Sequence, residues 1–138
     1  VALGPGGTVL RLAGLYHSTR GAHSHFLDKG SVPSWGGGLV NQLHYDDAAS
    51  LVLAALARGD KGKIFVGCDN APLTRQEIAD AAGKALGGSC EFTGSETDGP
   101  AGRMMNNDWT RSQLDWEPAY PSFTACMEEV GKAIPQWR

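Results

Sequence analysis

Three histidines early in the chain are the first residues whose types and spacing suggest chemistry. His17 precedes the pair His23 and His25. A His-x-His pair can present two imidazoles on one face of an extended segment, as a zinc site requires. No carboxylate or thiolate stands beside them at a spacing that would complete such a site. The sequence therefore predicts no metal centre.

Serine and glycine also fail to form a recognisable catalytic or phosphate-binding motif. No serine lies in the Gly-x-Ser-x-Gly turn that positions the nucleophile of many hydrolases. The glycines at residues 4–7 and 36–38 lack the full Gly-x-Gly-x-x-Gly spacing of a dinucleotide-binding turn. We interpret both stretches as turns or flexible loops.

Composition restricts the classes of protein that remain. The 138 residues and 41% hydrophobic content suit one globular domain over residues 1–138. The net charge of −3 is scattered, which argues against nucleic acid and anionic membranes as partners. No apolar run approaches the roughly 20 residues that span a bilayer. Three widely spaced cysteines fit free thiols in a reducing intracellular compartment such as the cytoplasm.

The elements that would position a site alternate between strands and helices. Residues 8–16 are almost continuously apolar, which is typical of a strand covered on both faces of a parallel sheet. Residues 17–38 show weak periodicity and predict a long loop with room for one helical turn. Residues 40–45 predict a second strand, after which Asp46 or Asp47 is placed to cap a helix that Gly59 ends.

The middle of the chain predicts another strand and a well-marked helix. Residues 63–68 form a short apolar run that predicts the strand. Thr74 and Glu77 are spaced as a capping box, in which each side chain bonds the backbone amide of the other. The pair Gly87-Gly88 is expected to end that helix, and residues 90–93 predict a small edge strand.

The remaining residues complete an α/β pattern. Asn107 and Ser122 are expected to cap the last two helices. His44 is expected to fix the turn into the helix before Gly59. The tryptophans are expected to pack in the core and at its edges rather than to stack on bases: Trp35, Trp109, Trp116 and Trp137. Alternating strands and helices predict the α/β class.

Four segments, in this order, resemble the second half of extended short-chain dehydrogenase/reductases, the group of NAD-dependent sugar-nucleotide epimerases and dehydratases. Residues 9–16 resemble the family's sixth strand with its Leu-Arg start, and residues 43–49 resemble its Ile-His-Val-x-Asp-Leu-Ala segment. Residues 64–74 resemble the strand, turn and helix start that follow, and residues 107–118 resemble the helix ending in Leu-Gly-Trp-x-Pro. The resemblance implies the C-terminal part of a Rossmann-type NAD(P)-binding fold with its small substrate-binding subdomain.

The resemblance also implies a role for the end of the 9–16 strand. In the family this strand end touches the nicotinamide side of the cofactor, NAD or NADP, and the nearby substrate. Leu12, Ala13 and Leu15 would then form a wall of the cofactor site, and Gly14 would form the floor of the substrate site. Plain strand packing is an equally good interpretation of these four residues.

Polar residues beyond the same strand end would face the substrate. Tyr16, His17 and Arg20 would lie at the carboxyl end of the strand, where open α/β sheets bind ligands, and Arg20 is the best candidate to bind an anion. Arg103 is either a second phosphate-binding arginine, as in sugar-nucleotide members, or a solvated surface residue. Val40 stands where those members have another phosphate-binding arginine, which argues against a nucleotide-sugar substrate.

The residues that carry catalysis in this family are absent from the sequence. The family's Tyr-x-x-x-Lys pair has no counterpart, because the residues four positions after Tyr16, Tyr45 and Tyr120 are Arg20, Ala49 and Thr124. The glycine-rich pyrophosphate turn is missing as well. We therefore predict no catalytic residue in this chain, and we interpret it as part of a larger protein.

Two hypotheses about function follow. The chain either completes the substrate pocket of an NAD(P)-dependent epimerase, dehydratase or reductase, or it is a non-catalytic scaffold or accessory subunit that keeps the fold. In both cases the inner face of the sheet should need a partner, either the missing N-terminal half or another protein. The small-molecule substrate is not identified, and the similarity to plant and algal reductase-like proteins makes a plastid conceivable.

Overall fold

The computed structural model describes residues 6–99 and 101–134. The helices are α1 (Ala22–Lys29), α2 (Tyr45–Arg58), α3 (Arg75–Leu86), α4 (Asp108–Leu114) and α5 (Phe123–Ala133). The strands are β1 (Val9–Leu12), β2 (Gly14–Tyr16), β3 (Ser31–Trp35), β4 (Leu39–Val40), β5 (Gln42–His44), β6 (Ile64–Gly67), β7 (Leu73–Thr74) and β8 (Glu91–Gly94). The turn predicted at residues 4–7 lies partly, and Trp137 wholly, outside the described residues.

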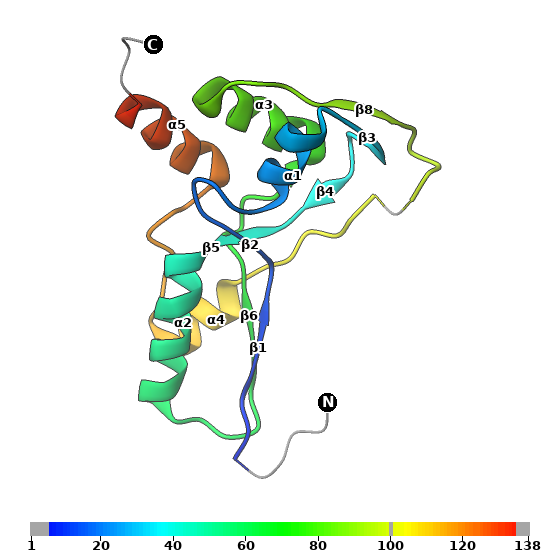
Figure 1. Ribbon diagram of the computed structural model, residues 1–138. Helices are drawn as coiled ribbons and strands as arrows, with labels where there is room; N and C mark the ends of the chain where they lie inside the picture. Colours follow the sequence, from blue (N-terminus) through cyan, green and yellow to red (C-terminus); the bar gives the residue numbers. More distant parts are fainter. Residues whose placement is uncertain (1–5, 100, 135–138) are drawn as a thin grey trace.

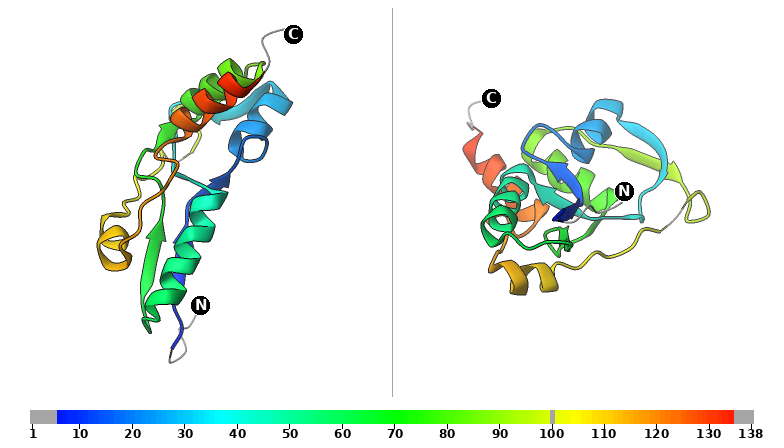
Figure 2. Two further views of the ribbon diagram at one scale, coloured as in Figure 1. Left: turned by 90° about the vertical axis from the view of Figure 1, so that its left-hand side faces the viewer. Right: turned by 90° about the horizontal axis from the view of Figure 1, so that it is seen from below.

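The elements gather at two ends of an elongated molecule (Figure 1). At one end, β1 and β6 run side by side with α2 and α4 next to them. At the other end, α1 and α3 lie close to β3 and β8, and Figure 2 shows α5 alongside α3. The short parallel strands β2 and β5 join the two ends. The predicted α/β class is confirmed.

The predicted 8–16 strand is confirmed, with one irregularity in its middle. β1 pairs in parallel with β6, from Val9 opposite Ile64 to Leu12 opposite Gly67. After Ala13 the same strand continues as β2, which pairs in parallel with β5. The amide of Ala13 donates to Gly67 O at 2.9 Å and the amide of Gly14 donates to Asn41 O at 3.1 Å. The strand therefore changes neighbours at this point, from β6 to β5.

The prediction of a long loop over residues 17–38 was wrong. This stretch forms the two-turn helix α1 and the strand β3, which pairs with β8 about sixty residues later in the chain. His23 and Phe26 are spaced three apart and are both buried on the inner side of α1. The helical signal was weak because one of its two anchors is a histidine, and the strand depends on a distant partner.

The start of α2 differs from the predicted cap. The N-cap residue is His44, whose Nδ1 accepts a hydrogen bond from the amide of Asp46 at 3.0 Å. The structural role predicted for His44 is therefore confirmed, and the capping role predicted for Asp46 or Asp47 was wrong. The helix ends at Gly59, as predicted, where φ of 67° suits a residue without a side chain.

The other predicted helix ends were mostly correct. The capping box of Thr74 and Glu77 is present at the start of α3, and Ser122 accepts a hydrogen bond from the amide of Ala125 at 3.0 Å. Asn107 does precede α4, but its side chain makes no capping hydrogen bond. None of the helices in the described part of the chain is long and apolar enough to cross a membrane.

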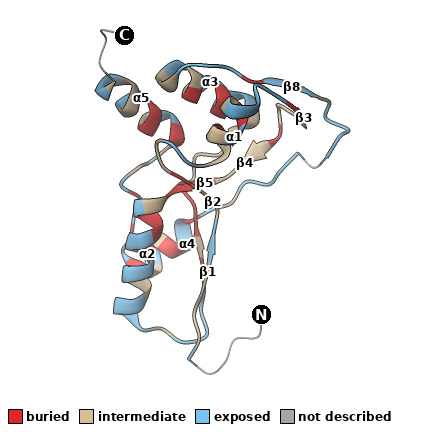
Figure 3. Cartoon of the chain, in the orientation of Figure 1, coloured by how far each residue is buried: buried red, intermediate tan, exposed pale blue. Residues whose placement is uncertain are grey.

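Two hydrophobic clusters make up the core, one at each end of the molecule (Figure 3). The larger cluster packs α1, α3 and α5 together around Phe123 and Ile78. The smaller one packs α2 against β1, β5 and β6 around Leu51 and Phe65. Gly67 lets this second cluster close up, because a Cβ there would lie 2.7 Å from side-chain carbons of both Leu12 and Leu51.

The three cysteines are free thiols, as predicted, and all three are buried. Burial raises the pKa of each thiol above its ordinary value. A thiol with a raised pKa stays protonated near neutral pH and is a poor nucleophile. The cysteines are therefore part of the packed interior rather than candidates for chemistry.

Candidate functional site

Two parallel strands end side by side and bring polar residues together just beyond their carboxyl ends. The last residues of β2 and β5, Tyr16 and His44, are opposite each other in the ladder. His17 follows directly, and its ring centroid lies 5.5 Å from that of Tyr45. The guanidinium carbon of Arg20 lies 5.9 Å from the centroid of the Tyr45 ring. The structure therefore places His17 and Arg20 at one strand end, as the sequence predicted.

A tight turn holds His17 and Arg20 in this arrangement. The amide of His17 donates to Arg20 O at 2.9 Å, and the amide of Arg20 donates to His17 O at 3.3 Å. The imidazole of His17 accepts a hydrogen bond from the amide of Thr19 through Nδ1, at 3.2 Å. That bond leaves Nε2 of His17 as the ring nitrogen that can donate to a ligand.

A shallow hollow lies between these strand ends and α5. It has a volume of about 520 Å³, and its wall includes His17, Tyr45, Tyr120 and Glu129. Tyr120 is held in place because its ring stacks on His44, with the centroids 3.8 Å apart. Aromatic faces and polar ring atoms together make this hollow suitable for a small organic molecule.

Tyr16 lies beneath this hollow rather than in it. Its side chain has no exposed surface, and its ring contacts His44 and Phe123 at centroid distances of 5.3 and 5.0 Å. Burial raises the pKa of the Tyr16 phenol, and the nearby Cys126 raises it further. The phenol therefore stays protonated. A role for Tyr16 in substrate binding stays a prediction, and in that role its ring would support the His44 ring.

The four residues nominated beside the cofactor occupy the junction of β1 and β2. Leu12 is 37% exposed, Ala13 and Leu15 are half-buried, and Gly14 is exposed. Ala13 and Leu15 also pack against the smaller hydrophobic cluster. A Cβ added to Gly14 would approach Asn41 O at 3.3 Å, so a side chain here would be crowded. Their roles at the cofactor and substrate stay predictions.

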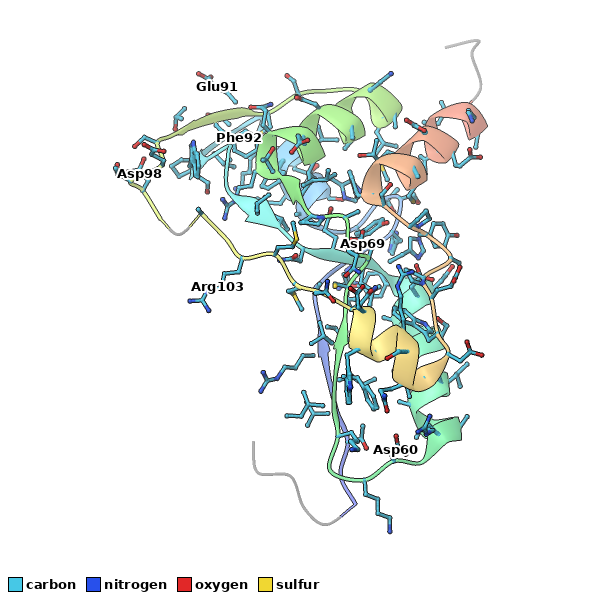
Figure 4. The ribbon with its side chains drawn as sticks, turned by 180° about the vertical axis from the view of Figure 1, so that it is seen from behind. Asp60, Asp69, Glu91, Phe92, Asp98 and Arg103 are labelled. Carbon is cyan, nitrogen blue, oxygen red and sulfur yellow. The ribbon has the colours of Figure 1, made fainter. Side chains whose placement is uncertain are left out.

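Arg103 lies apart from Arg20. It belongs to an exposed segment that Asn41 holds, since Asn41 Nδ2 donates to Arg103 O and Asn41 Oδ1 accepts from the amide of Met105 at 2.8 Å. Figure 4 shows the Arg103 side chain pointing away from the body of the molecule, on the side away from α5. The structure does not bring the two nominated arginines together, and anion binding by Arg103 stays a prediction.

The histidines do not gather into one group. His23 is fully buried against Phe123, and its Nε2 lies 3.0 Å from Ser18 O, whereas His25 packs beside Phe26. Burial lowers the pKa of His23, so its ring is neutral near neutral pH. Within residues 6–99 and 101–134, no group of three or more His, Cys, Asp or Glu side chains could hold a metal ion.

Asp47 is the first important residue whose role sequence reasoning missed. The side chain is buried, and its two oxygens accept hydrogen bonds from the amides of Ala119 and Tyr120 at 2.7 and 3.0 Å. Asp47 thereby fixes the segment that carries Tyr120 into the wall of the hollow. The only signal was an acidic residue inside an apolar helix, which we attributed to capping.

A second group of missed residues lies just beyond the end of β6. Asn107 donates through Nδ2 to Cys68 O at 2.6 Å and accepts from Arg111 Nε at 2.9 Å, and its amide donates to Asn70 Oδ1 at 2.7 Å. These bonds attach α4 to the end of β6. Asp69 lies at the same strand end, near the middle of the molecule in Figure 4.

Asp69 is unusual because it is buried with one oxygen unpaired. Its Oδ1 accepts from the amide of Ala71 at 2.8 Å, but Oδ2 has no hydrogen-bond partner among the described residues. Burial is the main cause that raises its pKa from 3.8 to about 6, and Asp47 adds to the effect. Its position after a strand was visible in the sequence, but its burial was not.

Comparison with known proteins confirms the fold and shows how much of it this chain contains. No protein-family model and no curated protein matches the sequence. A conserved protein of unknown function from Silicibacter pomeroyi matches with a TM-score of 0.71 and 26% identity. The dTDP-glucose 4,6-dehydratase of Bacillus anthracis, solved with NAD, matches with a TM-score of 0.69 and 20% identity. A human epimerase family protein, solved with NADPH, matches with a TM-score of 0.68 and 20% identity.

The chain therefore has the fold of part of an NAD(P)-binding epimerase or dehydratase. The matches cover 91, 91 and 92% of this chain but only 48, 43 and 48% of the three solved chains, in the same order. The chain spans less than half the length of these relatives, which fits a C-terminal portion. The resemblance inferred from sequence is confirmed for the fold, which is α/β and of the Rossmann type.

Proposed function

We propose that this chain supplies the substrate-side half of an NAD(P)-dependent epimerase, dehydratase or reductase. The observation that carries the proposal is the pair of parallel strands, β2 and β5, whose carboxyl ends meet beneath a hollow. In open α/β sheets ligands bind beyond the carboxyl ends of strands. The solved structures of the same fold include proteins with bound NAD and NADPH, which supports a nicotinamide cofactor.

The residues present fit one side of a nicotinamide cofactor and not the whole of it. The junction from Leu12 to Leu15 offers apolar side chains, and the exposed backbone of Gly14 allows a flat ring to approach closely. No glycine-rich turn for the pyrophosphate exists in the sequence. When bound, the cofactor would supply hydride transfer, and these residues would exclude water on one side of its ring.

The substrate would lie in the hollow above Tyr16. The guanidinium of Arg20 lies over the ring of Tyr45, which lines the hollow, and His17 supplies a donor at Nε2, so a substrate carrying an anionic group is favoured. Glu129 lies on the opposite wall, where its carboxylate pairs with Lys132 at 3.1 Å. Asp47 would position Tyr120 but would not touch the substrate.

The experiment is a calorimetric titration in which NADH or NADPH is added to the polypeptide encoded by the complete reading frame. We expect binding of at least one cofactor at micromolar concentration. Arg20→Ala should leave that affinity unchanged and should weaken substrate binding on the order of tenfold, and Lys29→Ala is the control for loss of a surface charge. Absence of heat with both cofactors would rule out the proposal.

The second candidate is a scaffold or accessory subunit that has kept the fold. It is favoured by the buried, protonated state of Tyr16 and by Val40, which pairs with Leu73 in the ladder instead of supplying a phosphate-binding arginine. A polypeptide that binds neither cofactor but co-purifies in a stable complex with another protein would support this candidate over the enzyme.

A further inference from the structure

The turn at residues 17–20, which carries the groups nominated to bind an anion, is held from behind by the first turn of α1. Nε2 of His23 lies 3.0 Å from Ser18 O. The hydroxyl of Ser24 donates to Thr19 O at 2.8 Å. Both carbonyl groups belong to the two central residues of the turn. α1 therefore fixes the backbone of the turn rather than the side chains that would meet a ligand.

His23 is the buried part of this attachment. Its side chain has no exposed surface, and its ring centroid lies 5.1 Å from that of Phe123 on α5. The start of α1 lies directly against the end of β2, because a Cβ added to Gly21 would be 2.8 Å from Cβ of Tyr16 and 3.3 Å from Nδ1 of His23. The His23 ring is therefore enclosed by α5, by Gly21 and by the turn.

The hydrogen bonds of His23 define its protonation state. Ser18 O can only accept, so Nε2 of His23 carries the hydrogen. Nδ1 is then the unprotonated nitrogen, and it is buried without a hydrogen-bond partner among the described residues. A second proton would place an N–H without an acceptor, and a positive charge, inside the protein. The enclosed position therefore suits the neutral ring only.

The hydrophobic cluster behind His23 has no negative charge that would stabilise a protonated ring. Its titratable members are Tyr16, Cys90 and Cys126, and burial raises the pKa of all three, so they stay protonated. Apart from Arg75, which donates to Trp35 O, every residue of α1, α3 and α5 that is charged at neutral pH is exposed.

The turn itself adds only positive groups. The guanidinium of Arg20 lies over the ring of Tyr45. Burial is the main cause that lowers the pKa of His23 below its ordinary value of 6.5, and the charge of a protonated His17 lowers it further, although the hydrogen bond to Ser18 O raises it. As pH falls below about 6.5, a released ring binds a proton that the enclosed ring does not, so acid favours release.

We propose that His23 is a positioning residue for an anion site at this turn, and that the site forms only while the His23 ring is neutral, an inference that rests on the proposed function. With Ser18 O held, the paired backbone bonds between His17 and Arg20 keep both side chains beside Tyr45. Release of the turn separates these groups, so acid weakens anion binding. Protonation of His17 alone would act in the opposite direction and strengthen it.

The test is a titration of the polypeptide encoded by the complete reading frame with sulfate, at several pH values between 5 and 8. Sulfate is a suitable probe because its charge does not change over this range. Binding is followed through the amide chemical shifts of residues 17–20, which locate it at the turn. We expect the affinity of the wild type to fall on the order of tenfold from pH 7.5 to pH 5, as the competent state becomes less populated.

Two matched variants separate His23 from other titrating groups. His23→Gln keeps a side-chain N–H near the position of Nε2 but does not titrate. Its sulfate affinity should be within about threefold of the wild type at pH 7.5 and should not fall at pH 5. His25→Gln removes an exposed histidine from the same helix and should keep the wild-type profile. His23→Leu removes the donor and should weaken binding on the order of tenfold at every pH.

Amide hydrogen exchange separates release of the turn from loss of the whole fold. The amides of His17 and Arg20 bond across the turn, so they report its opening. At pH 5 they should exchange on the order of tenfold faster in the wild type than in His23→Gln, whereas the amides of α2 should differ by less than about twofold. Equal changes in α2 and in the turn would mean that His23 supports only the fold, and would overturn the inference.

Two further results would overturn it: the same pH dependence of sulfate affinity in wild type and His23→Gln, or no sulfate-dependent shift at residues 17–20. If NADH or NADPH binds in the first of these cases, the proposed function is untouched. Sulfate binding that follows the protonation of His23, in a polypeptide that binds neither cofactor, would instead support the inference and reject the proposed function.

Discussion

Replacing Asp69 by asparagine should make the folded chain more stable at neutral pH and should remove part of its pH dependence. The carboxyl group is buried, its Oδ2 has no hydrogen-bond partner among the described residues, and its pKa is raised from 3.8 to about 6 mainly by burial. Asparagine keeps the oxygen that accepts from the amide of Ala71 and carries no charge. The substitution therefore removes the cost of ionising a buried group.

The size and sign of the effect follow from the pKa. Between pH 3.8 and about 6 the folded chain binds a proton at Asp69 that the unfolded chain has released, so the free energy of unfolding falls as pH rises through this window. The full difference corresponds to about 3 kcal/mol above pH 6. For a chain of this length, a free-energy difference of that size shifts the midpoint of thermal unfolding by about 10 °C.

The assay is urea unfolding of the wild type and Asp69→Asn at several pH values between 4 and 8. We expect the variant to gain stability over the wild type progressively from pH 4 to pH 6.5, with a constant gain above that range. His23, whose lowered pKa acts in the opposite direction, contributes equally to both proteins and cancels in the difference. Asp28→Asn, on the exposed side of α1, is the control for loss of a carboxylate. If the free energies of unfolding of wild type and Asp69→Asn differed by the same amount at every pH, the reasoning would be refuted.

Three further predictions concern stability and use the same unfolding assay. Asp47→Ala should cost about 3 kcal/mol, because the amides of Ala119 and Tyr120 lose a buried acceptor, whereas the exposed Asp46→Ala should cost less than about 1 kcal/mol. Thr74→Ala should cost about 1 kcal/mol by removing the capping box, and Thr74→Ser should restore most of it; equal stability of the two variants would contradict the cap. Gly102→Ala should cost about 2 kcal/mol, because φ is 86° there and a Cβ would press on Leu39 O.

Much of the fold was predictable because the signals were local. The Thr74 and Glu77 side chains bond to backbone amides only three residues away, so their spacing alone indicated the start of α3. The Gly59 and Ser122 helix ends depend in the same way on neighbouring residues. The apolar run over residues 8–16 likewise indicated a strand without reference to its neighbours in the sheet.

The candidate site was predictable only in part. The positions of His17 and Arg20 beyond a strand end followed from the order of the elements, but the ring of Tyr45 between them comes from a different strand end. Tyr16 was nominated with them because it lies at the carboxyl end of the predicted strand. Alternation along the strand instead turns Tyr16 into the interior, against Phe123 of α5.

The sequence by itself determined most of the alternation of strands and helices, most of the helix ends and the resemblance to half of a larger fold, because each depends on residues close together in the chain. Only the tertiary structure decided the roles of Asp47 and Asn107, whose hydrogen-bond partners lie 72 and 39 residues away. It also decided that Asp69 is buried and that β1 pairs with β6. Burial and strand pairing are properties of distant segments brought together, which no local pattern contains.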